Sequence, residues 1–255
     1  MSMTKLTTKF GEANLDYKKF RPGYPRELFD TILSSIKKPY KNAIDIGAGT
    51  GISTAILAEC FSNVTAIEPD KGMINVGTFS DSVTIINDCA ENVKLPFGEF
   101  DLVTSGNAFY WMDAARVLPL ISGWLTRQGV LAAYRYNLPM TNNERINQFI
   151  SDELKTKWDT FRHERLKDTE YTYRNIHNSS YFKNVRIHKI DNFVELSIDE
   201  FVGFFASTSY VSSFLRTLPS PQSYLEGLSK ELRKNIDHEM INVDFGLELI
   251  LADKK

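Results

Sequence analysis

The 255-residue sequence has very little cysteine and histidine, the side chains that bind soft metals and form disulfides. Its two cysteines, Cys60 and Cys89, fall in stretches expected to form core elements, so two buried reduced thiols are a better interpretation than a disulfide or a metal site. The four histidines, at positions 163, 177, 188 and 238, show no metal-ligand spacing. We therefore expect no metal.

Long hydrophobic runs and an excess of one charge are also missing. No segment approaches the ~20 apolar residues that span a bilayer, and charges run through the first twenty residues where a secretory signal would be apolar. The formal net charge is −2, and 42% of the residues are hydrophobic, as in ordinary globular proteins. These absences predict a cytoplasmic protein with no membrane association and no electrostatic reason to bind nucleic acid.

Glycine is concentrated at positions 47, 49 and 51, between a predicted strand and a predicted helix. Glycines there let the backbone turn sharply and let a ligand approach the main chain closely. The N-terminus of the following helix favours an anionic group at the turn. Taken alone, this loop could equally be a tight turn in any α/β protein.

The spacing of these glycines, Gly-x-Gly-x-Gly, differs from the Gly-x-Gly-x-x-Gly pattern of dinucleotide-binding proteins. Asp45 lies two residues before the first glycine, and Glu68 follows Gly47 by 21 residues at the end of the next predicted strand. In a doubly wound sheet, an acidic residue at that strand end accepts hydrogen bonds from a ribose. The two features together favour a nucleoside-containing cofactor.

Strand and helix patterns alternate along the chain and predict an α/β protein with a doubly wound, seven-stranded, mostly parallel sheet. Strands are expected at residues 43–46, 63–68, 83–87, 102–105, 130–136, 185–194 and 244–252. Asp70 is expected to cap one connecting helix, and another, at 113–125, contains Pro119, which could kink or split it. Residues 127–129 are predicted to form a turn.

The pattern changes beyond Pro139, where polar helical stretches replace the alternation. We expect a single domain over 1–255, in which residues 139–182 and 195–240 are helical cap elements around an acceptor pocket. Helices are predicted at 198–206 and at about 224–236. A packed surface insertion is the alternative interpretation of the first of these stretches, and the two are compatible.

The motif Asp45-Ile-Gly-Ala-Gly-Thr-Gly51 resembles the first motif of class I S-adenosylmethionine-dependent methyltransferases. The segment Tyr17-x-x-x-Arg21-Pro-x-Tyr-Pro25 resembles the N-terminal lid, here residues 12–25, of a subgroup that includes the trans-aconitate methyltransferase-like (type 11) proteins. The resemblance covers most of the chain. It implies a Rossmann-like class I fold, S-adenosyl-L-methionine as cofactor and methyl transfer as the reaction.

The resemblance also implies which residues contact the cofactor. The glycine loop would receive its methionine part, Glu68 its ribose, and Asp88 with Ala90 its adenine, although Asp88 could instead cap the next turn. The full set of expected cofactor residues is Tyr17, Arg21, Asp45, Gly47, Ala48, Gly49, Gly51, Glu68, Pro69, Met73, Asp88, Cys89, Ala90, Asn107 and Phe109.

The segment Asn107-Ala-Phe-Tyr-Trp111 resembles the family's Gln-Ala-Phe-His-Trp-like segment, with Asn107 and Tyr110 at the polar positions. Aromatic faces stabilise a cationic sulfonium, so Tyr17, Tyr110 and Trp111 are the catalytic candidates, unless they are core residues. The residues expected to contact the substrate are Trp111, Tyr134, Arg135, Ser209 and Tyr210. The Asn-Pro-Pro-Tyr type segment of many nucleic-acid amino methyltransferases is absent.

Three functions remain open at this stage, and the first is a monomeric or homodimeric methyltransferase of small molecules. The others are an RNA or protein methyltransferase and a non-catalytic cofactor-binding protein. A carboxylate acceptor would need only a cationic clamp, such as Arg135 or Arg216. A hydroxyl, amine or carbon acceptor would need a general base, for which Tyr110, Tyr134 and His177 are candidates. For Arg216 and His177, solvated surface charge is the better interpretation.

Overall fold

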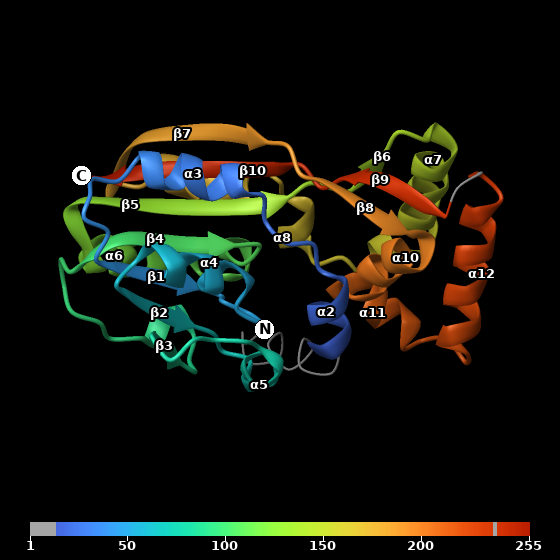
Figure 1. Cartoon of the computed structure of the whole chain (residues 1–255), viewed down its shortest axis with the longest axis horizontal. Helices are drawn as coiled ribbons and strands as arrows, with labels where there is room; N and C mark the ends of the chain where they lie inside the picture. Colours follow the sequence, from blue (N-terminus) through green and yellow to red (C-terminus); the bar gives the residue numbers. More distant parts are fainter. Residues whose placement is uncertain (1–13, 237–238) are drawn as a thin grey trace. The chain divides into compact units, whose positions relative to one another are not determined.

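The computed structural model describes residues 14–236 and 239–255, which divide into two compact units (Figure 1). The sheet unit consists of residues 23–137, 168–190 and 247–255. The helical unit consists of the described residues up to Pro22, of 138–167 and of those in 191–246. No helix in the described ranges is long and apolar enough to cross a bilayer.

The sheet unit is built on one seven-stranded sheet with the order β3-β2-β1-β4-β5-β10-β7. β1, β2, β3, β4 and β5 pair in parallel, whereas β10 is antiparallel to both β5 and β7, which confirms the mostly parallel sheet. The strand bounds are β1 (Asn42–Ile46), β2 (Asn63–Ile67), β3 (Val83–Ile86), β4 (Phe100–Gly106), β5 (Leu125–Tyr136), β7 (Phe182–Ile190) and β10 (Leu247–Lys254).

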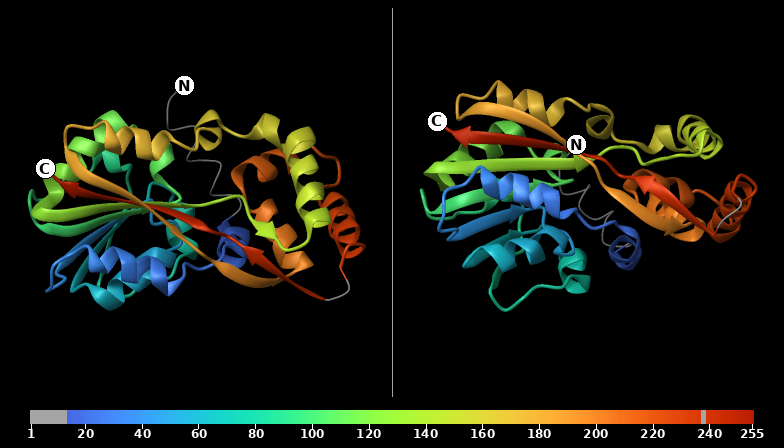
Figure 2. Two further views of the ribbon diagram at one scale, coloured as in Figure 1. Left: turned by 90° about the horizontal axis from the view of Figure 1, so that it is seen from above. Right: turned by 45° about the horizontal axis from the view of Figure 1, so that its top comes forward.

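Helices cover both faces of this sheet (Figure 2), because successive side chains of each buried strand point to opposite faces. Ile44 and Ile46 of β1 pack in one core with the helix α6, and Ala43 packs in the other with α3 and α4. The helix bounds of this unit are α3 (Arg26–Ser34), α4 (Ile52–Cys60), α5 (Lys71–Val76), η2 (Ala90–Asn92), η3 (Phe109–Trp111), α6 (Ala114–Trp124) and α9 (Tyr171–His177).

Two local predictions for these helices have different outcomes. Asp70 caps α5 as expected, since its carboxylate accepts from the N–H groups of Gly72 and Met73. Pro119, however, lies inside α6 without splitting it into two helices. The buried apolar face of α6, including Ile121 and Trp124, continues past the proline and holds the helix against the sheet.

The helical unit has short helices and a small sheet of its own, in the order β6-β9-β8. The helix predicted at 198–206 is confirmed, and the one predicted near 224–236 lies slightly earlier. The bounds are α2 (Asn14–Phe20), β6 (Met140–Thr141), α7 (Glu144–Glu153), the π-helix η4 (Leu154–Trp158), η5 (Asp159–Phe161), α8 (Glu164–Lys167), β8 (Phe193–Ser197), α10 (Ile198–Ala206), α11 (Ser209–Leu215), α12 (Pro221–Arg233) and β9 (Met240–Asp244).

This second sheet is absent from the sequence-based expectation, which placed single strands at 185–194 and 244–252. The first stretch is instead divided between β7 and β8, and the second between β9 and β10. In each case the two strands belong to different sheets. The chain turns where Phe245 N–H donates to the Asn192 oxygen at 2.8 Å and Gly246 N–H donates to Asp244 Oδ1 at 2.7 Å. Apolar residues alternate across both breaks, so periodicity alone could not locate them.

The turn predicted at 127–129 is also wrong, because these residues lie within β5. Phe100 pairs with Leu125 and Leu102 pairs with Val130. Between these two pairs, β5 contains more residues than β4. The Arg-Gln-Gly sequence therefore forms an irregularity inside a strand rather than a connection before it.

Candidate functional site

The candidate site of the sheet unit lies at the carboxyl ends of its parallel strands. β1 ends before Gly47, β2 before Glu68 and β4 before Asn107, and parallel pairing brings these ends to one edge. A ligand crevice in a doubly wound sheet forms at this edge. The structure thus brings together the loop, acidic and amide residues predicted from the sequence.

The glycine loop has left-handed backbone conformations, with φ values of 69° at Gly47, 58° at Gly49 and 88° at Gly51. A Cβ at Gly47 would lie 2.3 Å from the Cβ of Ala108, so this glycine lets the turn after β1 pass close to the turn after β4. The N–H groups of Gly47 and Ala48 donate to the oxygen of Ile67. Among the described residues, no side chain caps the α4 N-terminus that follows Gly51.

Asp45 is only 1% exposed and lies beneath the glycine loop. Its Oδ2 accepts from Thr54 Oγ1 at 2.6 Å, and its Oδ1 accepts from Thr104 Oγ1 at 2.9 Å. Burial raises the pKa of this carboxyl to about 6, although both threonines oppose the shift. With both oxygens used in this way, Asp45 joins β1, α4 and β4 and supports the loop from below. No pattern in the sequence pointed to its two threonine partners.

Glu68 is 8% exposed, and both of its carboxylate oxygens face backbone donors. Gly49 N–H donates to Oε2 and Asp70 N–H donates to Oε1, each at 2.8 Å. Burial raises the pKa of this carboxyl to about 7, while the two N–H groups oppose the shift. No lysine or arginine of the described ranges forms an ion pair with it. Glu68 is thus fixed directly beside the glycine loop.

The residues predicted to surround an adenine follow β2 and β3. Met73 and Ala90 are buried, and the oxygen of Pro69 accepts from the Asn87 side chain at 3.0 Å. Asp88 Oδ1 accepts from the N–H of Cys89 at 2.7 Å and from the Asn92 amide at 3.0 Å, so this carboxylate does support the next turn. Both cysteines are free but half-buried, not fully buried as predicted, because Cys60 ends α4 and Cys89 lies in the connection just before η2.

Asn107 adopts a left-handed conformation, with φ of 53°. Its amide nitrogen donates to the Tyr24 hydroxyl at 3.0 Å, and its Oδ1 accepts from Tyr136 N–H at 2.9 Å. The Tyr24 ring stacks on Tyr136 with 5.2 Å between centroids. Asn107 therefore joins β4, β5 and the segment before α3. Tyr24, missing from the predicted site, is part of this arrangement, and the density of aromatic residues at 17–25 was its one signal.

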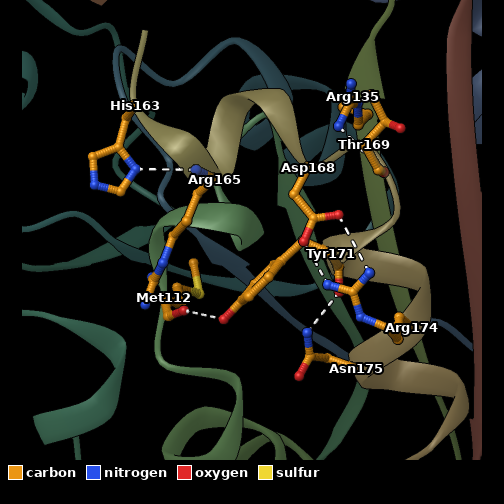
Figure 3. A network of polar contacts seen from close by, with 9 residues as sticks. All are labelled: Met112, Arg135, His163, Arg165, Asp168, Thr169, Tyr171, Arg174 and Asn175. Atoms are coloured by element: carbon orange, nitrogen blue, oxygen red, sulfur yellow. Dashed lines mark hydrogen bonds and ion pairs between the residues drawn. The ribbon is translucent and has the colours of Figure 1, made fainter.

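The aromatic candidates that follow Asn107 have different environments. Phe109 is 2% exposed and belongs to the core, whereas the rings of Tyr110 and Trp111 are partly buried, with 5.4 Å between their centroids. Tyr171 of α9 donates to the oxygen of Met112 at 3.0 Å and holds the end of this turn in place (Figure 3). Tyr110 and Trp111 are thus the aromatic candidates of the sheet unit that are partly exposed.

Two of the predicted substrate residues lie on β5, and one is unsuitable as a general base. Tyr134 is 3% exposed, and its hydroxyl is 2.6 Å from Ser53 Oγ. Burial raises its pKa well above the usual value, so it does not ionise at neutral pH. Arg135 is partly exposed and donates to the oxygen of Thr169 at 3.4 Å (Figure 3), leaving other donors of its guanidinium for a ligand.

Four predicted site residues belong to the helical unit: Tyr17, Arg21, Ser209 and Tyr210. The guanidinium carbon of Arg21 lies 4.7 Å from the centroid of the Tyr17 ring, which therefore stacks on a cation of this chain. Ser209 and Tyr210 begin α11. Another candidate base, His177 of the sheet unit, is exposed and stacks on Tyr173. The predicted lid residues 12 and 13 lie outside the described residues.

The residues at the strand ends fit a nucleoside cofactor that carries hydroxyl groups and a positive charge. Glu68 offers a carboxylate that accepts only N–H donors, so it retains lone pairs for ribose hydroxyls. Thr50 Oγ1, within the loop, is buried and has no hydrogen-bond partner in residues 14–236 and 239–255, so it could bond a ligand. The nearby carboxylates of Asp45 and Asp70 favour a cation. Among the described residues, no group of three His, Cys, Asp or Glu side chains could hold a metal.

Comparisons with known proteins agree with this geometry. A family model described as a methyltransferase domain matches residues 44–133. A candidate methyltransferase of Dictyostelium discoideum is 29% identical over 99% of this chain and 97% of its own length. A candidate S-adenosylmethionine-dependent methyltransferase of Saccharomyces cerevisiae is 28% identical over 48% of this chain and 45% of its own.

A solved structure from Anaeromyxobacter dehalogenans, described as a candidate type II methyltransferase, has the same fold. It superposes with a TM-score of 0.75 at 23% identity, over 92% of this chain and 98% of that one. The glycine loop and the buried Glu68 lie within the region that the family model matches. The strands of the seven-stranded sheet lie partly within this region and partly beyond it. The family model and the relatives support a class I S-adenosylmethionine-dependent methyltransferase.

Proposed function

We propose that this methyltransferase acts on a small molecule, as the trans-aconitate methyltransferase-like proteins that it resembles do. The observation that carries the proposal concerns residues 155–189, where lysines and arginines are frequent. A nucleic-acid-binding surface would need such cations free to face phosphates. Here most of these cations have carboxylate partners within their own unit.

The ion pairs are distributed over both units. Lys157 pairs with Glu153 at 2.6 Å, Arg162 with Asp159 at 2.9 Å, Lys167 with Asp159 at 3.2 Å and Arg186 with Asp253 at 2.8 Å, and Arg174 pairs with Asp168. Neutralised cations give little attraction for a polyanion, so the positive stretch of sequence does not become a positive stripe.

The residues of the sheet unit then have defined tasks. The cofactor supplies a methyl group on positively charged sulfur, so the protein mainly aligns the acceptor and excludes water. Glu68 would accept hydrogen bonds from the ribose, and the partly buried rings of Tyr110 and Trp111 would stabilise positive charge. Because Tyr134 is buried and protonated, a carboxylate acceptor, which needs no base, suits this site better than a hydroxyl.

A transfer experiment tests the proposal. The purified chain is incubated with S-adenosylmethionine labelled in its methyl group and, separately, with a small-molecule extract, total RNA and total protein. We expect label in the small-molecule fraction, lost in Glu68→Gln and retained in the control Glu99→Gln, which changes an exposed carboxylate. Label in RNA or protein instead would contradict the small-molecule assignment. No transfer, despite cofactor binding, would leave a non-catalytic binding protein.

A further inference from the structure

Tyr134 of β5 has a buried side chain whose ring is fixed within the sheet unit. The ring meets that of Tyr24 edge to face, with 5.0 Å between centroids, and that of Phe29 at 6.3 Å. A Cβ at Gly106 of β4 would lie 2.6 Å from the Tyr134 ring, so this glycine lets the ring lie directly against the neighbouring strand. The contacts fix the ring, and the ring in turn determines where the phenol hydroxyl lies.

The hydroxyl of Tyr134 reaches the first turn of α4, the helix that follows the glycine loop. It lies 2.6 Å from Ser53 Oγ, and Ser53, the second residue of the helix, is buried as well. In the same turn, Gly51 N–H donates to the Ala48 oxygen and Ala55 N–H donates to the Gly51 oxygen, each at 2.9 Å. Hydrogen bonds thus run without a break from the glycine loop into α4, so a displacement of Ser53 would also displace the loop.

A second set of contacts joins the same turn to the strands beneath the loop. Thr54, next to Ser53, donates to one oxygen of Asp45, and Thr104 donates to the other. Burial raises the pKa of Tyr134, and hydrogen bonds with Ser53 and Thr104 oppose the shift, so Thr104 lies beside both the phenol and the carboxylate. These five side chains form a closed ring of contacts that joins β1, α4, β5 and β4.

We propose that Tyr134 is a positioning residue for the cofactor, whose hydroxyl acts through Ser53 to hold the first turn of α4 and the glycine loop in the geometry that receives the ligand. Packing alone does not require the hydroxyl, because a phenylalanine would make the same ring contacts with Tyr24 and Phe29. A paired, buried polar group instead fixes one arrangement of the elements that it joins. This role replaces the substrate contact expected from the sequence, and it holds whichever acceptor the protein methylates.

Calorimetric titration with S-adenosylhomocysteine and unfolding in urea, both on the full chain, test this role. Tyr134→Phe keeps the ring and removes the hydroxyl, so we expect binding to weaken about three- to tenfold, because a loosened binding loop loses affinity. Ser53→Ala should weaken binding similarly, and the double variant no more than either single one, because the two hydroxyls form one contact. The matched control is Tyr40→Phe, which removes another tyrosine hydroxyl of the same unit, bonded to the Leu33 oxygen at 3.1 Å. It should lower the free energy of unfolding and leave the affinity unchanged.

Three results would overturn the positioning role. Wild-type affinity in Tyr134→Phe would reduce the hydroxyl to a contribution to folding stability. Additive losses in the double variant would show that the hydroxyl does not act through Ser53. An equal loss of affinity in Tyr40→Phe would mean that binding follows the stability of the whole unit rather than the geometry of the loop. If circular dichroism shows that Tyr134→Phe is unfolded, Ser53→Ala provides the same comparison with Tyr40→Phe, because it removes the other half of the contact.

Discussion

Each unit of the molecule contains a glutamate that is 8% exposed, but the two carboxylates have different partners. Glu153 of the helical unit pairs with Lys157 at 2.6 Å and accepts from the Tyr224 hydroxyl, which in turn accepts from Trp158 Nε1 at 3.0 Å. Within the part of the chain that the structure describes, Glu68 of the sheet unit has only two backbone N–H donors. Its charge is therefore left for a ligand.

The difference teaches how to separate a structural carboxylate from a binding carboxylate. Glu153 is neutralised by Lys157 and bonded to Tyr224, whose hydroxyl also accepts from Trp158, so it contributes to packing of the helical unit. Glu68 stays uncompensated, and its raised pKa shows the energetic cost of keeping it at the loop. The following predictions test this comparison.

The largest effect is expected from Gly47→Ala, which damages the frame that holds Glu68. The new Cβ would lie 2.3 Å from the Ala108 Cβ, and φ is 69°, so unfolding should become easier by about 3 kcal/mol or more. Urea unfolding measures the loss. The control, Gly98→Ala, has a similar φ of 72° but no atom near the new Cβ, and should cost only about 1 kcal/mol. Equal losses in the two variants would disprove the steric contact.

The second prediction exchanges each glutamate for glutamine. Glu68→Gln should weaken S-adenosylhomocysteine binding about 10- to 100-fold, because hydrogen bonds to a charged acceptor contribute about 1.5–3 kcal/mol. Glu153→Gln should leave binding unchanged but lower the free energy of unfolding by about 1–3 kcal/mol. Calorimetry measures S-adenosylhomocysteine binding, and chemical unfolding measures the free energy of unfolding, for each of the two variants. The distinction fails if Glu153→Gln weakens binding as much as Glu68→Gln does.

The third prediction concerns pH and follows from the raised pKa of Glu68, about 7 against an ordinary 4.5. The folded ligand-free protein holds this proton more tightly than the unfolded chain, so the contribution to stability should be lost as pH rises from about 4.5 through about 7. The pKa of Asp45 is also raised, to about 6, so its contribution to stability should likewise be lost as pH rises, at lower pH than that of Glu68. Unfolding in urea at several pH values measures the slope, which should be shallower in Glu68→Gln.

Cofactor affinity should change in the opposite direction over the same range. Ribose hydroxyls bond the ionised form of Glu68 better, so S-adenosylhomocysteine should bind about tenfold more weakly at pH 6 than at pH 8. Calorimetry at the two pH values measures this change, with Glu68→Gln as the control that should show little of it. Affinity that stays flat for the wild type would mean that the cofactor does not use this carboxylate.

The smallest effect is expected for an exposed ion pair. Arg174→Gln removes the partner of Asp168, and both side chains are largely solvated, so we expect no measurable change in thermal unfolding or in cofactor binding. A marked loss of either property would show that this surface pair has a role that its exposure does not suggest.

The sequence predicted the parts of the site that depend on local order. A glycine loop after a strand, and an acidic residue after the next strand, meet at one edge in any parallel sheet, so Gly47 and Glu68 could be placed before the structure was available. The partners of Asp45 could not, because Thr54 and Thr104 come from separate elements and threonine is common in both helices and strands.

The remaining differences have one physical origin, which is that apolar alternation does not specify which sheet a strand joins. The stretches 185–194 and 244–252 each read as one strand, yet each is divided between sheets at residues 191–192 and 245–246. In the same way, an aromatic pattern did not distinguish buried Phe109 and Tyr134 from accessible Tyr110. Exposure depends on tertiary packing, which a single sequence does not encode locally.

The position of β10 has a consequence for synthesis on the ribosome. This strand, at residues 247–254, lies between β5 and β7, so the sheet that carries the glycine loop cannot close before these residues have been made. The loop, Glu68 and Asn107 emerge much earlier and must wait beside an open β5 edge. The sheet unit is thus completed after the helical unit, and until β10 is made the nascent chain depends on protection of that edge from wrong pairing.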